Sequence, residues 1–182
     1  MFVKSIAFVD TRVADYLSLI AALDPGIDVY ILDGGLDGIG QIADVMAGYS
    51  GVEALHIISH GSEASLLIGS SAFDAESLEA HRADLARIGR SLSAEADILL
   101  YGCNVAAGSL GQSFVQAIAA ATDADVAASV DVTGAAALGG NAELEYQSGV
   151  TGFHDADAFD NIAEFTNIAW PGILLHQFQG LG

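Results

Sequence analysis

Two residues of this 182-residue chain have the chemistry of a nucleophile and its base. Cys103 is the only cysteine, and His60 is one of five histidines. A cysteine nucleophile needs a neighbouring group that accepts the thiol proton, and histidine usually has that role. Each of the two follows a short apolar segment, 53–59 before His60 and 97–101 before Cys103. Both side chains are therefore expected where a strand ends, which predicts a nucleophilic site.

Backbone donors for such a site follow the same two segments. Acyl transfer needs hydrogen-bond donors for the oxyanion that develops on the attacked carbonyl. The N–H of Gly61 can approach a substrate without a side chain in the way, and the N–H of Cys103 is the second candidate. The alternatives are a cysteine that packs as a small hydrophobe and a histidine that is an ordinary hydrogen-bonded loop residue. The residues alone leave catalysis and packing both open.

Alternating strands and helices must position these residues. The expected strands are 5–9, 28–32, 53–59, 97–101 and 125–128, and the expected helices are 13–23, 39–49, 77–92, 109–122 and 157–170. Strands that alternate with helices of this length indicate βαβ units and a parallel sheet. We therefore predict a three-layer α/β/α sandwich with a mostly parallel sheet and small β-hairpins at 66–73 and 142–153. One domain over 1–170 would be followed by a tail at 171–182.

Further polar residues follow the expected strands. In open α/β sheets, ligands bind beyond the carboxyl ends of the strands. The candidate pocket residues at these ends are Asp10, Arg12, Asn104, Ser129 and Asp131. Asp131 could select a basic side chain by charge complementarity, or it could stabilise its own turn. Asp10 and Arg12 either pair with each other or line the cleft.

The charge of the chain excludes several classes of partner. There are 24 acidic and 5 basic residues, and the net charge is −19. Such a field repels phosphate backbones and anionic lipid surfaces, so we expect neither nucleic-acid nor membrane binding. No apolar run reaches the roughly 18 residues of a membrane span. A single cysteine excludes an intrachain disulfide, and the first residues are not expected to form a Sec-type signal peptide.

Other chemistry-bearing segments have simpler interpretations. The glycine-rich segment 33–40 lacks the G-x-G-x-x-G spacing and is expected to be a tight loop rather than a nucleotide site. Segment 155–161 begins like a calcium loop but has Phe159 at the fifth position and no glycine at the sixth. We interpret it as the acidic first turn of a helix, with a weak surface calcium site as the alternative.

The remaining histidines and arginines predict no metal centre. His56 is expected in the core or facing the sheet. The arginines of 82–90 alternate with acidic residues, which is typical of a solvated ion-pair face. His81, His154 and His176 have no partners at metal-ligand spacing. We expect no metal and no cofactor.

Several segments resemble a bacterial family catalogued as domain of unknown function 4347. They are 8–16, 56–62, 99–106, 127–134 and 144–146, and the likeness runs from about Phe8 to Gly149. Domains of that family typically lie near the N-terminus of very large, repeat-containing surface or secreted proteins. The resemblance therefore implies a secreted or cell-surface location, while the composition leaves a cytoplasmic one open.

That family is in turn similar to the clan CD cysteine peptidases, which include caspases, gingipain and clostripain. The shared signature is an apolar strand ending in His-Gly, followed by an apolar strand ending in cysteine, here 55–61 and 98–103. The resemblance implies that His60 is the base, that Cys103 is the nucleophile, and that the N–H groups of Gly61 and Cys103 hold the oxyanion. It also assigns specificity to the loop 129–133. Gly102 departs from the pattern, because caspases have alanine there.

Two functions of different classes follow. The first is a cysteine endopeptidase-like domain that hydrolyses a peptide bond with a His-Cys dyad, in autoprocessing of a large secreted or surface protein. Its partner would be a peptide or protein segment, which could belong to the same polypeptide. The alternative is a non-catalytic N-terminal interaction module of a giant adhesin or exported repeat protein. The sequence leaves the oligomeric state open.

Overall fold

A six-stranded sheet forms the centre of the protein. The computed structural model describes residues 5–23, 25–134, 138–141 and 143–149. In spatial order the strands are β2 (Asp28–Leu32), β1 (Ser5–Asp10), β3 (Val52–Ile58), β7 (Leu92–Tyr101), β8 (Asp125–Ala128) and β9 (Tyr146–Gln147). Neighbouring strands are parallel except for β8 and β9, which are antiparallel. The mostly parallel sheet predicted from the alternating pattern is confirmed.

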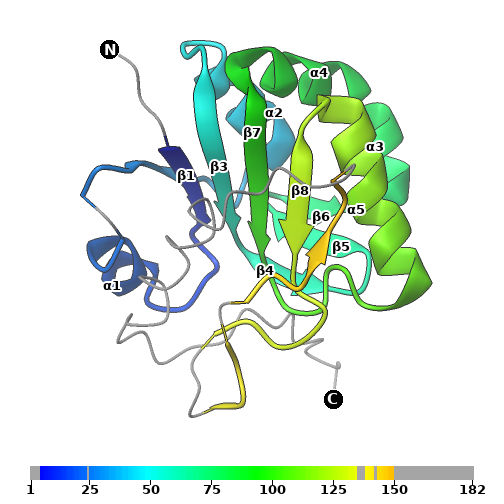
Figure 1. Ribbon diagram of the computed structural model, residues 1–182. Helices are drawn as coiled ribbons and strands as arrows, with labels where there is room; N and C mark the ends of the chain where they lie inside the picture. The colour runs from blue at the N-terminus through cyan, green and yellow to red at the C-terminus, as the bar shows by residue number, and fades with distance from the viewer. Residues whose placement is uncertain (1–4, 24, 135–137, 142, 150–182) are drawn as a thin grey trace.

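Helices cover the two faces of this sheet (Figure 1). One face packs against α2 (Gly38–Met46), α3 (Ala75–Ala80), α4 (Arg82–Ser91) and α5 (Gly108–Thr122). The other face packs against the short α1 (Tyr16–Ala21) through Leu19. Successive strand residues point to opposite faces, so Ile57 joins the first apolar core and Ile58 joins the second. This arrangement is the α/β sandwich expected from the sequence.

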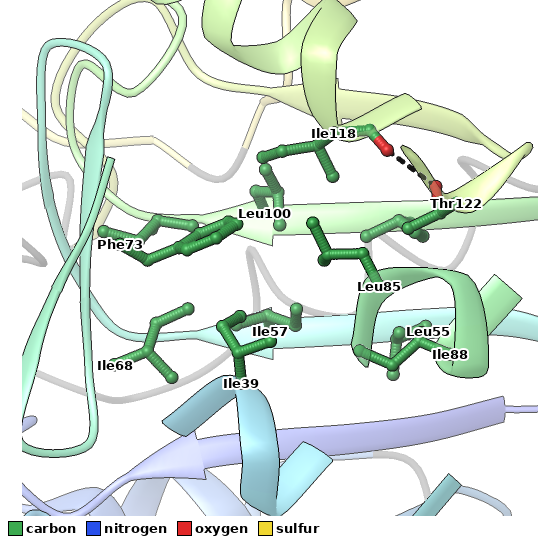
Figure 2. A pocket seen from close by; sticks show the side chains of 12 residues that line it. Ile39, Leu55, Ile57, Ile68, Phe73, Leu85, Ile88, Leu100, Ile118 and Thr122 are labelled. Carbon is green, nitrogen blue, oxygen red and sulfur yellow. Dashed lines mark hydrogen bonds between the residues drawn. The ribbon is translucent and has the colours of Figure 1, made fainter. Parts of the chain in front are cut away.

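A small gap lies in the packing of the larger core (Figure 2). The gap has a volume of about 20 Å³, and apolar side chains such as Leu100 and Ile118 line most of it. The hydroxyl of Thr122, on the same wall, already donates to the Ile118 carbonyl oxygen at 2.8 Å. A buried water needs two to four polar partners, so this gap is a packing feature and not a ligand site.

Two of the predicted elements have other bounds in the structure. The single helix expected over 77–92 is two helices, because the backbone at His81 (φ −102°, ψ 13°) is not helical. The Asp74 side chain caps the first helix and accepts from the backbone N–H of Ser77 at 3.0 Å. The strand expected to begin at residue 97 begins at Leu92.

One predicted hairpin is present and has gained a strand. The hairpin expected over 66–73 consists of β5 (Ser65–Ile68) and β6 (Ser71–Phe73), and β4 (His60–Ser62) pairs with it. Residues 143–149 of the second expected hairpin are described, and they contain β9, which pairs with β8. The helix expected at 157–170, the tail at 171–182 and the segment 155–161 lie outside the described residues. Among the helices described, none has the length and apolar character needed to cross a membrane.

Candidate active site

The carboxyl ends of β3 and β7 bring the predicted nucleophile and base segments together. The two strands are parallel neighbours, and the N–H of Ser59 donates to the Tyr101 carbonyl oxygen at 3.1 Å. A Cβ atom on Gly61 would lie 2.8 Å from the carbonyl carbon of Gly102 and 2.9 Å from the carbonyl oxygen of Cys103. Only glycine allows this approach. The segment that contains His60 and Gly61 therefore packs directly on the backbone of Gly102 and Cys103.

Hydrogen bonding fixes which ring nitrogen of His60 carries the proton. Its Nε2 lies 3.0 Å from the carbonyl oxygen of Arg12. A carbonyl oxygen only accepts, so Nε2–H is the donor, and the neutral ring has its lone pair on Nδ1. Nδ1 is buried and has no hydrogen-bond partner among the described residues. The imidazole is thus held in the tautomer in which Nδ1 can accept a proton.

A buried carboxylate holds the Arg12 carbonyl in place. Asp10 is 1% exposed, and its Oδ1 accepts from the backbone N–H of Arg12 at 2.9 Å and from Arg12 Nε at 3.2 Å. Its Oδ2 accepts from the N–H of Gly69 at 2.7 Å, and the Arg12 guanidinium donates to the Gly69 carbonyl oxygen. Of the two alternatives for Asp10 and Arg12, the structure shows the pairing. Together they join the turn after β1 to the β5–β6 turn.

The Cys103 side chain is fully buried. Its Sγ accepts from the Thr133 N–H at 3.2 Å and donates to the Thr133 carbonyl oxygen at 3.5 Å. It also packs in the second apolar core with Val9, Ile58 and Tyr101. Solvent therefore does not reach the thiol in this conformation.

The segment 129–133 contacts the Cys103 sulfur through Thr133 and is hydrogen-bonded to the turn that follows Cys103. Asn104 adopts φ 59°, a left-handed conformation that asparagine tolerates, and this gives a sharp turn after the strand. The N–H of Asn104 donates to the Asp131 carbonyl oxygen at 2.8 Å, and the N–H of Ala106 donates to that of Ser129 at 2.9 Å. The loop proposed for specificity thus also contains Thr133, the residue whose backbone is hydrogen-bonded to the thiol.

The Asp131 carboxylate stabilises its own loop. It accepts from the Ser129 hydroxyl at 3.1 Å and from the Asn141 side-chain amide at 3.1 and 3.3 Å. These contacts are those expected of an aspartate that stabilises its own turn, which is one of the two alternatives for Asp131. Asp131 stays exposed, whereas Ser129 is fully buried. Ser129 and Asp131 thus belong to the loop that carries Thr133, the residue bonded to the Cys103 sulfur, and Asn104 is joined to that loop by its backbone N–H.

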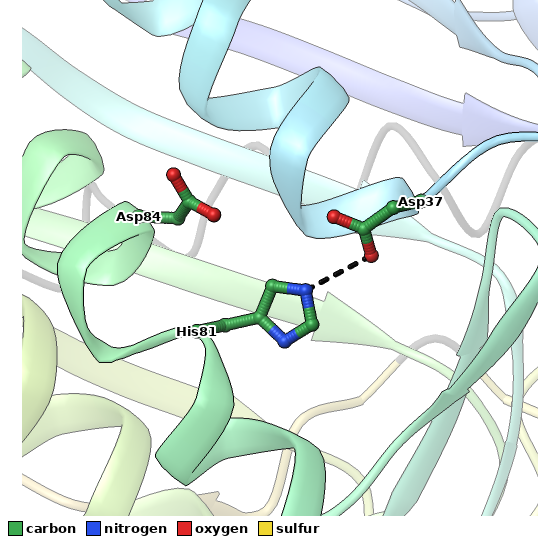
Figure 3. Close-up of side chains that lie close together, drawn as sticks. All are labelled: Asp37, His81 and Asp84. Atoms are coloured by element: carbon green, nitrogen blue, oxygen red, sulfur yellow. Dashed lines mark hydrogen bonds and ion pairs between the residues drawn. The ribbon is translucent and has the colours of Figure 1, made fainter.

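Two histidines elsewhere have environments that bear on chemistry. His56 is buried in the core, as expected, and stacks on Tyr101 with ring centroids 6.0 Å apart. Burial lowers the pKa of His56 to about 4. His81 lies 3.0 Å, Nε2 to Oδ1, from Asp37, and Asp84 completes a cluster with them (Figure 3). The spacing argument missed this cluster, because Asp37 comes from a loop 44 positions earlier.

Comparison with known proteins places the chain in a family context. Residues 6–168 match the family described as domain of unknown function (DUF4347). No curated protein and no solved structure matches the chain.

Proposed function

The chain belongs to the DUF4347 family, and we propose that this member is a cysteine peptidase-like domain in a latent state. One observation carries the proposal. The imidazole of His60 is oriented by a backbone carbonyl through Nε2 and keeps a buried, unpartnered Nδ1 among the described residues. A base that is oriented by a third group beside a nucleophile is the general arrangement of nucleophilic catalysis. The backbone contact between Gly61 and Cys103 supports it further.

In the proposed reaction, Nδ1 of His60 accepts the thiol proton of Cys103 as the sulfur attacks the carbonyl carbon of a peptide bond. The N–H groups of Gly61 and Cys103 stabilise the oxyanion. The C–N bond then breaks, and the leaving amine takes the proton from His60. A water molecule that loses a proton to His60 attacks the thioester and releases the carboxylic acid, and the proton returns to the sulfur.

Attack requires that the thiol first leave Thr133. In the closed conformation the sulfur is engaged with both the N–H and the carbonyl oxygen of Thr133. The segment 129–133 must therefore move before a substrate carbonyl can reach Cys103. A peptide segment, including one from the same polypeptide, is the proposed substrate. This requirement fits autoprocessing of a large secreted or surface protein, in which cleavage must wait for a trigger.

A second candidate function has its own supporting observation. The full burial of Cys103 among apolar side chains is also what a purely structural cysteine shows. The domain would then be a non-catalytic interaction module at the N-terminus of an adhesin or exported repeat protein. In that case His60 and Cys103 only stabilise the edge of the sheet.

The rate at which iodoacetamide modifies Cys103, followed by intact mass spectrometry, separates the two functions. Replacement of Asp131 by alanine removes the hydrogen bonds of its carboxylate to Ser129 and Asn141 and so loosens segment 129–133, and this variant should react faster than the wild type. If the dyad is functional, adding His60→Ala to Asp131→Ala should slow the reaction near neutral pH, whereas adding His81→Ala should not. The loosened variant should also cleave members of a peptide library.

The same measurements can overturn the peptidase proposal. A thiol in the Asp131→Ala variant that reacts like a free cysteine, is indifferent to His60 and cleaves no peptide would contradict it. The interaction module would then be the function that the geometry supports.

A further inference from the structure

Three polar side chains meet in the helical layer, and the proposed function does not use them. Asp37 caps the start of α2, His81 lies at the junction of α3 and α4, and Asp84 belongs to the first turn of α4. One nitrogen or oxygen atom from each lies within 4.8 Å of the other two. Figure 3 shows the imidazole between the two helices, with both carboxylates turned toward the same space. Solvent reaches all three side chains, so an ion could enter.

Backbone contacts orient two of these three groups. Nδ1 of His81 lies 2.7 Å from the Ser77 carbonyl oxygen, so it carries a hydrogen. In the neutral ring, the Nε2 lone pair then faces Oδ1 of Asp37 at 3.0 Å. Two acceptors at this distance repel each other, so a cation or a proton must stand between them. A ring N–H donated to a backbone carbonyl is also the usual support of a metal-bound histidine.

The spacing of the atoms fits coordination. Zinc lies roughly 2.0–2.2 Å from nitrogen and oxygen ligands, so two ligands of a tetrahedral ion are about 3.3 Å apart. The distance of 3.0 Å between His81 Nε2 and Asp37 Oδ1 is close to that value. Asp37 is oriented by its other oxygen, Oδ2, which accepts from the Gly40 N–H at 2.8 Å. Asp84 Oδ1 pairs with Arg87 Nη1 at 2.9 Å, and its ligand atom lies within 4.8 Å of the other two, so its carboxylate must shift toward the ion to complete the set.

We infer that Asp37, His81 and Asp84 form a binding site for a divalent transition-metal ion of the zinc class, with water in the remaining position. One imidazole and two carboxylates are a donor set that zinc accepts. The net charge of −19 raises the local concentration of cations around the protein. Because the ligands come from α2 and from the α3–α4 junction, the ion would join two parts of the helical layer.

Calorimetric titration of the 182-residue chain with zinc chloride tests this site. All proteins in the experiment carry Cys103→Ser, so that the thiol contributes no ligand. We expect one ion per chain, with affinity reduced about tenfold or more by His81→Gln and by Asp84→Asn. The matched control is Glu79→Gln, which removes the charge of an exposed carboxylate two residues before His81 that pairs with Arg82 instead.

Cobalt absorption gives a second readout. Co²⁺ in the site should show a visible band that His81→Gln abolishes and Glu79→Gln leaves unchanged. Thermal unfolding without metal checks that each variant folds, and Asp84→Asn carries the test if His81→Gln does not fold. Affinity that is equal in the wild type and in the folded variants overturns the inference. Absence of binding at millimolar zinc also overturns it, and the cluster is then an imidazolium–aspartate ion pair.

Discussion

Acidification should destabilise this protein through one buried histidine, His56. Its side chain is 5% exposed, and its Nδ1 has no hydrogen-bond partner within the described part of the chain. Burial lowers the pKa of His56 from 6.5 to about 4. The unfolded chain therefore binds a proton at this residue at a higher pH than the folded chain does. Stability contributed by neutral His56 is present above pH 6.5 and is lost as the pH falls toward 4.

The size of this effect follows from the pKa difference. Each unit of difference between the folded and unfolded pKa values corresponds to about 1.4 kcal/mol. The whole shift of His56 is therefore worth about 3 kcal/mol of unfolding free energy. Between pH 7 and pH 5 the expected loss is about 2 kcal/mol. That amount is a large part of the total stability of about 5–15 kcal/mol that a typical domain has.

Urea unfolding at pH 7 and pH 5, for the wild type and for His56→Leu, measures the contribution. Leucine is similar in volume and does not titrate, so the carboxylates contribute equally to both proteins and cancel in the comparison. We expect the wild type to lose about 2 kcal/mol more than His56→Leu between the two pH values. Parallel loss of stability in the two proteins would refute the argument that burial keeps His56 neutral.

Three further substitutions test the packing around the core and the candidate site. Leu100→Ala enlarges the gap in the larger core and should lower the free energy of unfolding, measured in urea, by about 3 kcal/mol. An unchanged free energy of unfolding would refute the packing argument. Gly61→Ala places a Cβ under 3 Å from the backbone of Gly102 and Cys103 and should cost about 2 kcal/mol, whereas the control Gly48→Ala, whose Cβ has an ordinary contact at 3.5 Å, should not destabilise the fold. Asp10→Asn replaces a carboxylate that accepts from two backbone N–H groups, and it should lower the thermal unfolding midpoint by an amount equivalent to about 2 kcal/mol. An unchanged midpoint would contradict the role of Asp10 in joining the turn after β1 to the β5–β6 turn.

Local patterns in the sequence determined the layers of the fold and the edge where the site lies. Apolar segments of strand length alternate with helical spacing, and these signals depend only on neighbours along the chain. They predict that His60 and Cys103 each follow a strand, and the parallel sheet brings these strand ends to one edge. The hairpin at 66–73 was predictable for the same reason, since its turn residues lie between two short apolar runs.

Tertiary structure decided the state of the site. The tautomer of His60 depends on the carbonyl oxygen of Arg12, and the burial of Cys103 depends on the backbone of Thr133. Backbone groups are the same in every residue, so the sequence carries no sign of which distant one a side chain will meet. The meeting of Asp37 with His81 is also a product of how α2 packs beside α4. Contacts between distant segments depend on the packing of whole elements, which local periodicity does not describe.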